Sequence, residues 1–256
     1  MTVIVGVLCK DGVVIGSDSS ATFRAGTLPT IEQPAQKVFL TRPDVLFAGC
    51  GSVGCVQRFH AYLERFRPIL NLPKEKGLEI AKRITKAMIE DLEATSCPRN
   101  TFAALVAFPS SQGLQLCEFE PEYLQPELKT ENLWFVSMGS GQPITDPFLG
   151  MMRRVFFSSS RPNLREGIFA VTWTLQQAIE LNTGGINGPM QIGVLTQKPG
   201  SGEASARLLD EVELDEHRNN VKAIERHLAD YRDKLSGQGA QAIPQLQGDP
   251  VIPPPA

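Results

Sequence analysis

The sequence predicts an α+β protein in which strands and helices are grouped along the chain. Three observations lead to this prediction. Apolar, β-branched runs open the chain, two helical periods follow in succession, and a second group of strands then precedes a second pair of helices. Alternating βαβ units would indicate a parallel sheet, whereas this grouping favours antiparallel sheets sandwiched between helix pairs.

The first four strands should form two hairpins. In the first hairpin, Asp11-Gly12 supplies the positive φ that a tight turn needs, and in the second hairpin the turn contains Pro43. The strands are expected at residues 3–8, 13–16, 37–40 and 45–48.

Two amphipathic helices are expected next, one ending before Pro68 and one beginning after the break at Asn71-Leu72-Pro73. Their apolar residues recur at helical spacing. The first helix presents Val56, Phe59, Leu63 and Phe66, and the second presents Ala81, Ile84, Met88 and Leu92.

The second half of the domain repeats this order. Strands are expected at 102–108, 114–118 and 133–138, followed by a helix over 147–157 and another that presents Leu164, Ile168, Val171, Leu175 and Ala178. The last helix should stop at Asn182-Thr183-Gly184-Gly185, because glycine adopts the left-handed conformation of a helix cap at little cost. A strand at 190–196 completes a domain that we place at residues 2–200.

The C-terminal part differs in character. Residues 201–235 form a charged helical extension whose apolar residues, Val221, Ile224, Leu228, Tyr231 and Leu235, step by three and four. This narrow seam fits a helix docked on its own domain, or a helix that contacts another subunit. Residues 236–256 end in a proline-rich run and are expected to be disordered.

Composition excludes several classes of protein. With a net charge of −3, the chain has no basic field that would recruit nucleic acid. The N-terminus has no basic segment before an apolar run and no stretch of about 18 apolar residues, so we expect neither secretion nor a membrane span. We therefore predict a cytoplasmic protein.

The five cysteines are an odd number, with no CxxC pair and no histidines at zinc spacing. They indicate reduced thiols, no metal site and no bound cofactor. The functional alternative, a nucleophilic cysteine, would need a base from among His60, His217 and His227.

The segment Gly49-Cys50-Gly51-Ser52-Val53-Gly54 matches GxGxxG between an apolar strand and a helix. A dinucleotide-binding fold would continue from that helix into a parallel strand with an acidic residue, but here a second helix comes next. The glycines more simply let backbone amides approach another group closely.

Thr2 would carry a hydroxyl and a free α-amine on one residue once Met1 is removed, and removal is expected because threonine is small. An α-amine titrates near about 7.7–8 and can serve as a general base without a histidine. Position alone is weak support, since most second-position threonines have no such role.

A set of ordered motifs between residues 2 and 197 resembles proteasome β subunits and the related bacterial HslV peptidase. The opening TVIVGV, followed by DGVVIGSDS, is similar to the opening of that family. So are Gln36-Lys37-Val38, the strand end Phe47-Ala48-Gly49-Cys50-Gly51, Met138-Gly139-Ser140-Gly141 and Glu180-Leu181-Asn182-Thr183-Gly184-Gly185. Each motif is weak by itself, and their order makes the set specific.

The resemblance implies a four-layer αββα sandwich of the N-terminal nucleophile (Ntn) hydrolases, and a role for each matched residue. Thr2 would be the nucleophile, with Lys37 stabilising its alkoxide and Asp18 holding Lys37. The amide of Gly49 would bind the oxyanion, and Ser140 would position the α-amine. Glu180 and Thr183 would complete the catalytic set, while Ala21, Thr22 and Phe47 would contact substrate.

The chain departs from the family pattern at three places. Glu180 stands where the family has aspartate, and Thr183 stands where it has serine. The segment between Thr22 and Lys37 is about three residues longer than usual. Phe47 should narrow the primary specificity pocket, so we expect small or slender substrate side chains, or poor turnover of standard peptides.

The resemblance also implies a threonine endopeptidase that works inside a homo-oligomeric double ring. Its substrates would be unfolded protein or peptides, and an ATPase regulator could bind the ring. The short leader, Met1 alone, resembles HslV, and the extended C-terminus is most similar to the bacterial proteasome homologue branch, with the Anbu branch second. Two alternatives remain: a proteolytically weak or inactive ring scaffold, and an Ntn hydrolase of small amides.

Overall fold

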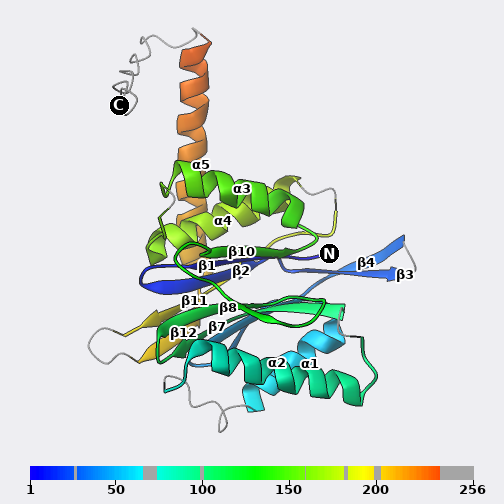
Figure 1. The fold of residues 1–256 in the computed structure, drawn as a ribbon. Helices are drawn as coiled ribbons and strands as arrows, with labels where there is room; N and C mark the ends of the chain where they lie inside the picture. Colours follow the sequence, from blue (N-terminus) through cyan, green and yellow to red (C-terminus); the bar gives the residue numbers. More distant parts are fainter. Residues whose placement is uncertain are drawn as a thin grey trace, which may run out of the picture.

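The computed structural model describes residues 1–25, 28–65, 74–98, 101–158, 160–181, 184–198 and 203–236. Within these ranges the protein has five helices and two five-stranded antiparallel sheets, so the predicted α+β class is confirmed. Figure 1 shows the two sheets stacked on each other, with helices outside both.

The first sheet contains the beginning of the chain. Its strand order is β10 (Phe135–Gly139), β1 (Val3–Leu8), β2 (Gly12–Ser17), β11 (Gln191–Gln197) and β12 (Ala204–Leu208). Every residue of β1 and β2 is buried, because both faces of these strands are covered. A β-carbon added to Gly6 would lie 2.5 Å from Leu105 in the second sheet, whereas one added to Gly16 would lie 2.5 Å from Val171 in a helix.

The second sheet has the order β5 (Val38–Arg42), β6 (Val45–Gly51), β7 (Phe102–Ser110), β8 (Gly113–Phe119) and β9 (Pro126–Leu128). Helices α1 (Val53–Arg65) and α2 (Gly77–Ala94) cover its outer face (Figure 1). Their apolar residues, including Phe59, Ile84 and Met88, form one buried cluster with β6 and β7. The apolar faces of the two predicted helices therefore pack on this sheet.

Helices α3 (Gln142–Val155) and α4 (Leu164–Leu181) lie outside the first sheet (Figure 1). We expected α3 to begin at Pro147, but it begins five residues earlier and contains that proline. Pro143 lies in its first turn, where a missing N–H leaves no hydrogen bond unmade.

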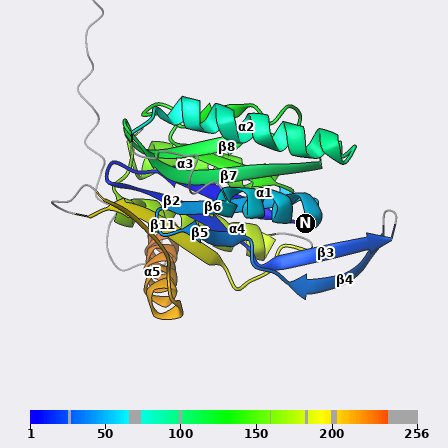
Figure 2. The ribbon, with the colours of Figure 1, turned by 90° about the horizontal axis from the view of Figure 1, so that it is seen from below.

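Four further strands were not expected. A ribbon of β3 (Ser20–Ala25) and β4 (Leu28–Pro34) projects from the body, as Figure 2 shows. The short strands β9 and β12 each extend the edge of a sheet. Short or proline-containing edge segments give little periodic signal, which is why the sequence did not predict them.

Strand β12 also corrects the expected domain boundary at residue 200. It pairs with β11 throughout its length, so the chain beyond 200 still belongs to the first sheet. The helical extension is confirmed as α5 (Glu211–Leu235), which begins at a capping box formed by Asp210 and Glu213. Nearly all of the expected proline-rich tail, residues 237–256, lies outside the described residues.

The first half of α5 packs on its own domain. Leu214, His217 and Val221 are buried, and Trp173 of α4 donates to Glu225 over 3.2 Å. The second half projects away from the body (Figure 1), and Leu228, Tyr231 and Leu235 are exposed there. Docking on the domain therefore accounts for only part of the apolar seam.

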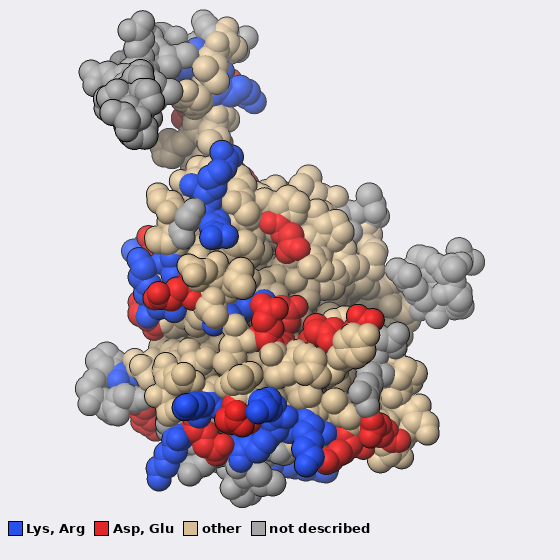
Figure 3. Space-filling model, in the orientation of Figure 1, with Lys and Arg blue, Asp and Glu red and all other residues tan. Residues whose placement is uncertain are grey.

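Charges of both signs are interspersed over the face of the molecule shown in Figure 3, most densely around α2. None of the helices within the described ranges combines the length and the apolar character that a membrane span requires.

Candidate active site

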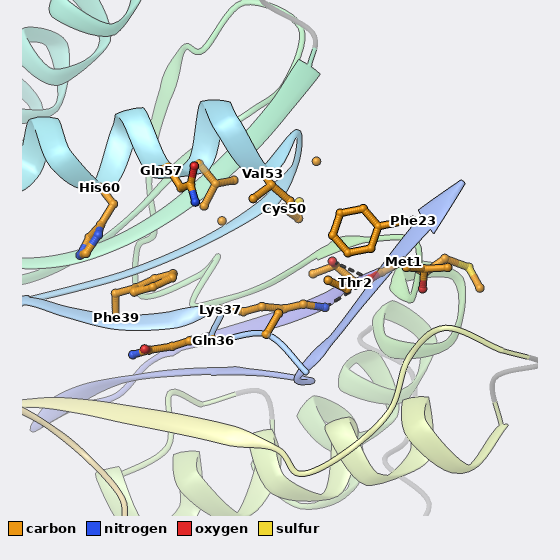
Figure 4. Close-up of a pocket in the computed structure, with 16 residues that line it drawn as sticks. Met1, Thr2, Phe23, Gln36, Lys37, Phe39, Cys50, Val53, Gln57 and His60 are labelled. Carbon is orange, nitrogen blue, oxygen red and sulfur yellow. Dashed lines mark hydrogen bonds between the residues drawn. The ribbon is translucent and has the colours of Figure 1, made fainter. Parts of the chain in front are cut away.

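A cavity of about 520 Å³ lies where β1 begins and β6 ends. Residues at the N-terminus, in β3, just before β5, at the end of β6 and in the first turns of α1 line it. Figure 4 shows Lys37 pointing toward Thr2 and Met1, with Phe39 and His60 at the other end. The cavity therefore extends from the start of the chain to the side of the second sheet that α1 covers.

A buried ion pair forms the floor beside Thr2. Lys37 Nζ lies 2.8 Å from both carboxylate oxygens of Asp18, whose side chain is fully buried. Asp18 also accepts hydrogen bonds from the amides of Val3, at 2.9 Å, and Ser20, at 3.1 Å. This carboxylate thus ties the beginning of β1, the beginning of β3 and Lys37 together.

The backbone of Lys37 is held separately by Gln191 at the start of β11. The side-chain oxygen of Gln191 accepts from the amides of Lys37, at 2.9 Å, and Val38, at 3.2 Å, and its nitrogen donates to the carbonyl of Ala35 at 2.9 Å. Sequence reasoning missed Gln191, since a glutamine at the start of a strand carries no signal of a contact 154 residues away.

Burial lowers the pKa of Lys37, and the attraction of Asp18 opposes this effect without reversing it. Lys37 therefore releases its proton more readily than a solvent-exposed lysine does. A lysine with a depressed pKa inside a cavity is a candidate for a functional role.

Thr2 is held by the loop that follows β10. Its nitrogen donates to Ser140 Oγ over 3.0 Å, and its carbonyl oxygen accepts from Ser140 Oγ at 3.3 Å and from the amide of Gly141 at 3.2 Å. Gly139 has a φ of +91°, and a β-carbon there would lie 2.4 Å from the carbonyl oxygen of Thr2. Only glycine lets this loop approach the N-terminal strand so closely.

Two donors converge on the carbonyl oxygen of Met1. Thr2 Oγ1 donates to it over 2.7 Å, and Lys37 Nζ donates to it over 3.2 Å. Figure 4 shows both hydrogen bonds at the mouth of the cavity. The Thr2 hydroxyl and the Lys37 side-chain nitrogen are therefore brought together by one shared acceptor.

The glycine-rich end of β6 forms the wall opposite Thr2. A β-carbon on Gly49 would lie 2.9 Å from Val56 of α1, so the strand and the helix are in close contact. Neighbouring Cys50 also lines the cavity, and burial raises its pKa to about 11. Its thiol is therefore protonated at neutral pH. His60 lies toward Phe39, away from Cys50 (Figure 4), so the geometry does not favour a nucleophilic cysteine.

Phe47 does not line the cavity, which corrects our expectation that it narrows the specificity pocket. It is fully buried in the cluster beneath α1 and stacks on Phe39 and on His60, with ring centroids 5.7 Å and 5.9 Å apart. On a β-strand alternate side chains face opposite sides, so Phe47 points into the α1 layer. Phe39 and His60, both half-buried, line the cavity, and Phe47 supports them from behind.

Ala21 and Thr22 line the cavity from β3. Thr22 Oγ1 donates to the carbonyl of Gly185 over 3.4 Å, and a β-carbon on Gly185, whose φ is +79°, would lie 2.7 Å from Thr22 Oγ1. Nearby, Glu32 of β4 accepts hydrogen bonds from Ser20 and Asn187, which lower its pKa. The ribbon is thus attached to the loop before β11.

Glu180 is not brought to the cavity, contrary to the role that the resemblance implied. Its side chain is exposed on α4 and accepts from Gln176 over 2.9 Å, in a separate hollow that Arg218 and Lys222 of α5 also line. The reason is its place on the helix, since residue 176 lies one turn away on the same face. Thr183, the other member of that motif, lies outside the described residues.

Among the described residues, no cluster of three or more His, Cys, Asp and Glu side chains could hold a metal ion. Neither a scan against protein-family models nor a search of curated proteins finds a match to this chain.

Proposed function

We propose that this chain is a threonine endopeptidase of the Ntn type, similar to proteasome β subunits and HslV. Thr2 is its nucleophile once Met1 has been removed. The observation that carries the proposal is the convergence of the Thr2 hydroxyl and the Lys37 ammonium group on one carbonyl oxygen, beside a cavity that could receive a peptide.

The general base is the α-amine of Thr2. In the intact chain this nitrogen is a peptide amide bonded to Ser140 Oγ at 3.0 Å. Removal of Met1 turns it into an amine with a pKa near about 7.7–8 and a free lone pair. Held by Ser140, the amine takes the proton from Thr2 Oγ1, directly or through one water.

The reaction proceeds through an acyl-enzyme. Thr2 Oγ1 attacks the substrate carbonyl, the C–O bond forms, and the oxyanion is stabilised by the amide of Gly49. The C–N bond then breaks, and the leaving amine takes the proton from the α-amine. Water hydrolyses the ester and restores Thr2. Lys37, oriented by Asp18, stabilises negative charge on Oγ1 during attack and release.

Substrate would run along β3. An extended peptide can pair with an exposed strand edge, and Ala21 and Thr22 lie on the cavity side of the projecting ribbon. A side chain of that peptide would enter the cavity between Phe39, Val56 and His60, where apolar and polar groups alternate.

The wider context rests on the sequence resemblance. Two stacked antiparallel sheets with helices outside them support a four-layer αββα Ntn-hydrolase sandwich. A double ring of identical subunits in the cytoplasm would keep an unselective nucleophile away from folded proteins, and an ATPase regulator would deliver unfolded substrate. The bacterial proteasome homologue branch is the nearest by motif, with the Anbu branch second.

The decisive test is the intact mass of the purified protein before and after reaction with an epoxyketone directed at N-terminal threonine. We expect loss of Met1 and one adduct on Thr2. The Thr2→Ala variant is the matched control and should form no adduct. Retention of Met1, or an unmodified Thr2, contradicts the proposal.

Two alternatives keep the fold and change the activity. A ring scaffold without efficient chemistry is favoured by the position of Glu180, which leaves the Thr2 site without that carboxylate. A small-amide hydrolase would use the same nucleophile. Turnover of casein and of short peptides, measured against Thr2→Ala, distinguishes the three functions. Sedimentation tests the ring, because a monomer at micromolar concentration would exclude it.

A further inference from the structure

Two cysteines from different helices meet beside the candidate active site. Cys55 is buried in the first turn of α1, and Cys97 is half-buried just after α2. Their sulfur atoms lie 3.4 Å apart although the residues are 42 positions apart in the sequence. Both sulfur atoms also lie near the hydroxyl of Thr101, at 3.4 Å and 3.8 Å.

The five thiols differ in their readiness to ionise. Burial raises the pKa of Cys9, Cys50 and Cys117. Burial also acts to raise the pKa of Cys55, but hydrogen bonds with Thr101, Ser52 and Cys97 and the charge of Arg58 outweigh it, so the pKa is lowered. The thiolate is the reactive form, and Cys55 therefore combines a lowered pKa with a neighbouring thiol.

We propose that Cys55 and Cys97 are a redox pair that forms a reversible intramolecular disulfide. With hydrogen peroxide as oxidant, one sulfur becomes a sulfenic acid as the O–O bond breaks and one water leaves. The second thiolate attacks that sulfur, the S–S bond forms, and hydroxide leaves as a second water. Two thiols lose two electrons and two protons in total, and a dithiol reductant reverses the step.

The geometry of the two cysteines suits such a bond. A disulfide has an S–S distance of about 2.05 Å, so the two sulfur atoms must approach each other by about 1.4 Å. Cys97 is partly open to solvent, which lets a small oxidant reach the pair. Disulfides in a reducing compartment are mostly transient and regulatory, which fits a pair that is reduced in the resting protein.

The bond would act on the cavity through α1. The amide of Ser52 already donates to the carbonyl of Thr101 over 2.8 Å, so the start of α1 rests on the segment that follows α2. The same first turns of α1 present Val53 and Gln57 to the cavity (Figure 4), and Val56 lines it as well. Drawing Cys55 toward Cys97 therefore shifts the cavity wall that faces Thr2.

The test treats the purified full-length chain with hydrogen peroxide, alkylates the remaining thiols and maps peptides without reduction. Two of the five cysteines should no longer react with the alkylating reagent after oxidation and should react again after treatment with dithiothreitol. A cross-linked peptide should join residues 55 and 97. Cys97→Ser and Cys55→Ser should each abolish the cross-link. Cys117→Ser is the matched control, since that thiol is buried elsewhere, and should retain it.

Peroxide products on Cys97 without a link to Cys55, or a disulfide between two chains, would overturn the proposal. A second measurement does not depend on peptide recovery. The cross-link closes a long loop and should raise the melting temperature of the oxidised wild type but not of Cys97→Ser, because it restricts the unfolded chain. Equal melting temperatures for oxidised and reduced wild type would contradict a stable bond.

The effect on the cavity rests on the proposed function and needs its own readout. Oxidation should slow epoxyketone labelling of Thr2 by roughly tenfold in wild type and leave Cys97→Ser unchanged. If reduced wild type is not labelled at all, the proposed function fails while the cross-link is still decided by mass. If the cross-linked protein is labelled as fast as the dithiol form of the protein, the disulfide does not change the cavity.

Discussion

Two lysines in this protein are buried to the same extent, but their surroundings shift their pKa values in opposite directions. The side chains of Lys37 and Lys129 are 7% and 6% exposed. Lys37 pairs with a single carboxylate, Asp18, which is itself fully buried. Lys129, at the edge formed by β8 and β9, lies 2.7 Å from both Glu118 and Glu127, and Glu127 is 58% exposed.

The difference appears in the direction of the two pKa shifts. For both lysines burial is the largest influence and lowers the pKa. Two carboxylates outweigh burial at Lys129 and raise its pKa, whereas one carboxylate at Lys37 does not. A buried ion pair is therefore not by itself a sign of function. The cavity and the Thr2 hydroxyl beside Lys37 are what distinguish it.

The largest effect on stability should come from Asp18→Asn. It leaves Lys37, in a buried site, without the one ion-pair partner it has among the described residues, and the cost should be about 4 kcal/mol of unfolding free energy. Glu118→Gln is the matched change and should cost about 1 kcal/mol, because Lys129 keeps Glu127. Urea unfolding of both variants tests this, and equal costs would show that the two pairs are equivalent.

Lys37→Met should reduce the rate of epoxyketone labelling of Thr2 by about 100-fold, since it removes the cation next to the developing alkoxide. Lys129→Met carries the same substitution at a site with no substrate group and should label at the wild-type rate. Labelling rates followed by intact mass give both values. Similar losses in the two variants would indicate a general structural effect.

The two lysines should also respond oppositely to alkaline pH. The folded pKa of Lys37 is below 10.5, so between that pKa and 10.5 the unfolded chain binds more protons and the stability contributed by Lys37 rises with pH. The folded pKa of Lys129 is above 10.5, so its contribution is complete below 10.5 and is lost as pH rises through the folded value.

Urea unfolding of wild type and both methionine variants from about pH 8 to about pH 11 measures this contrast. The stability difference between wild type and Lys37→Met should increase with pH up to 10.5. The difference for Lys129→Met should stay constant and then decrease. Parallel curves for the two variants would contradict the opposite shifts.

Ser140→Ala should have a smaller effect, slowing Thr2 labelling by about fivefold. The variant loses the hydroxyl that holds the Thr2 nitrogen, while the amide of Gly141 still holds its carbonyl. Ser140→Thr, which keeps a hydroxyl, should recover part of the rate, and failure to do so would argue against positioning through that oxygen.

The smallest expected effect is that of Glu180→Gln, which should leave the labelling rate unchanged. Its carboxylate contacts Gln176 on α4 and lies outside the Thr2 cavity. A loss comparable to that of Lys37→Met would restore the role implied by the sequence resemblance and would require α4 to end differently when substrate binds.

The parts of the site that could be predicted lie next to the ends of strands near the N-terminus. Thr2, Asp18 and Lys37 are placed by hairpins whose turns and apolar runs are local properties of the sequence. Gly49 follows from the end of an apolar strand. Ser140 was found by motif alone, because nothing in the spacing of residues reports that β10 pairs with β1.

The sequence by itself determined the α+β class, the strands that flank Thr2, Asp18 and Lys37, and the C-terminal helix, since period and turn chemistry act over a few residues. The tertiary structure alone decided that Gln191 holds Lys37, that Phe39 and His60 replace Phe47 as the wall, and that Glu180 faces away. It also brought Cys55 to Cys97. These contacts join segments far apart in the chain, and their geometry depends on how sheets and helices stack, which no local pattern encodes.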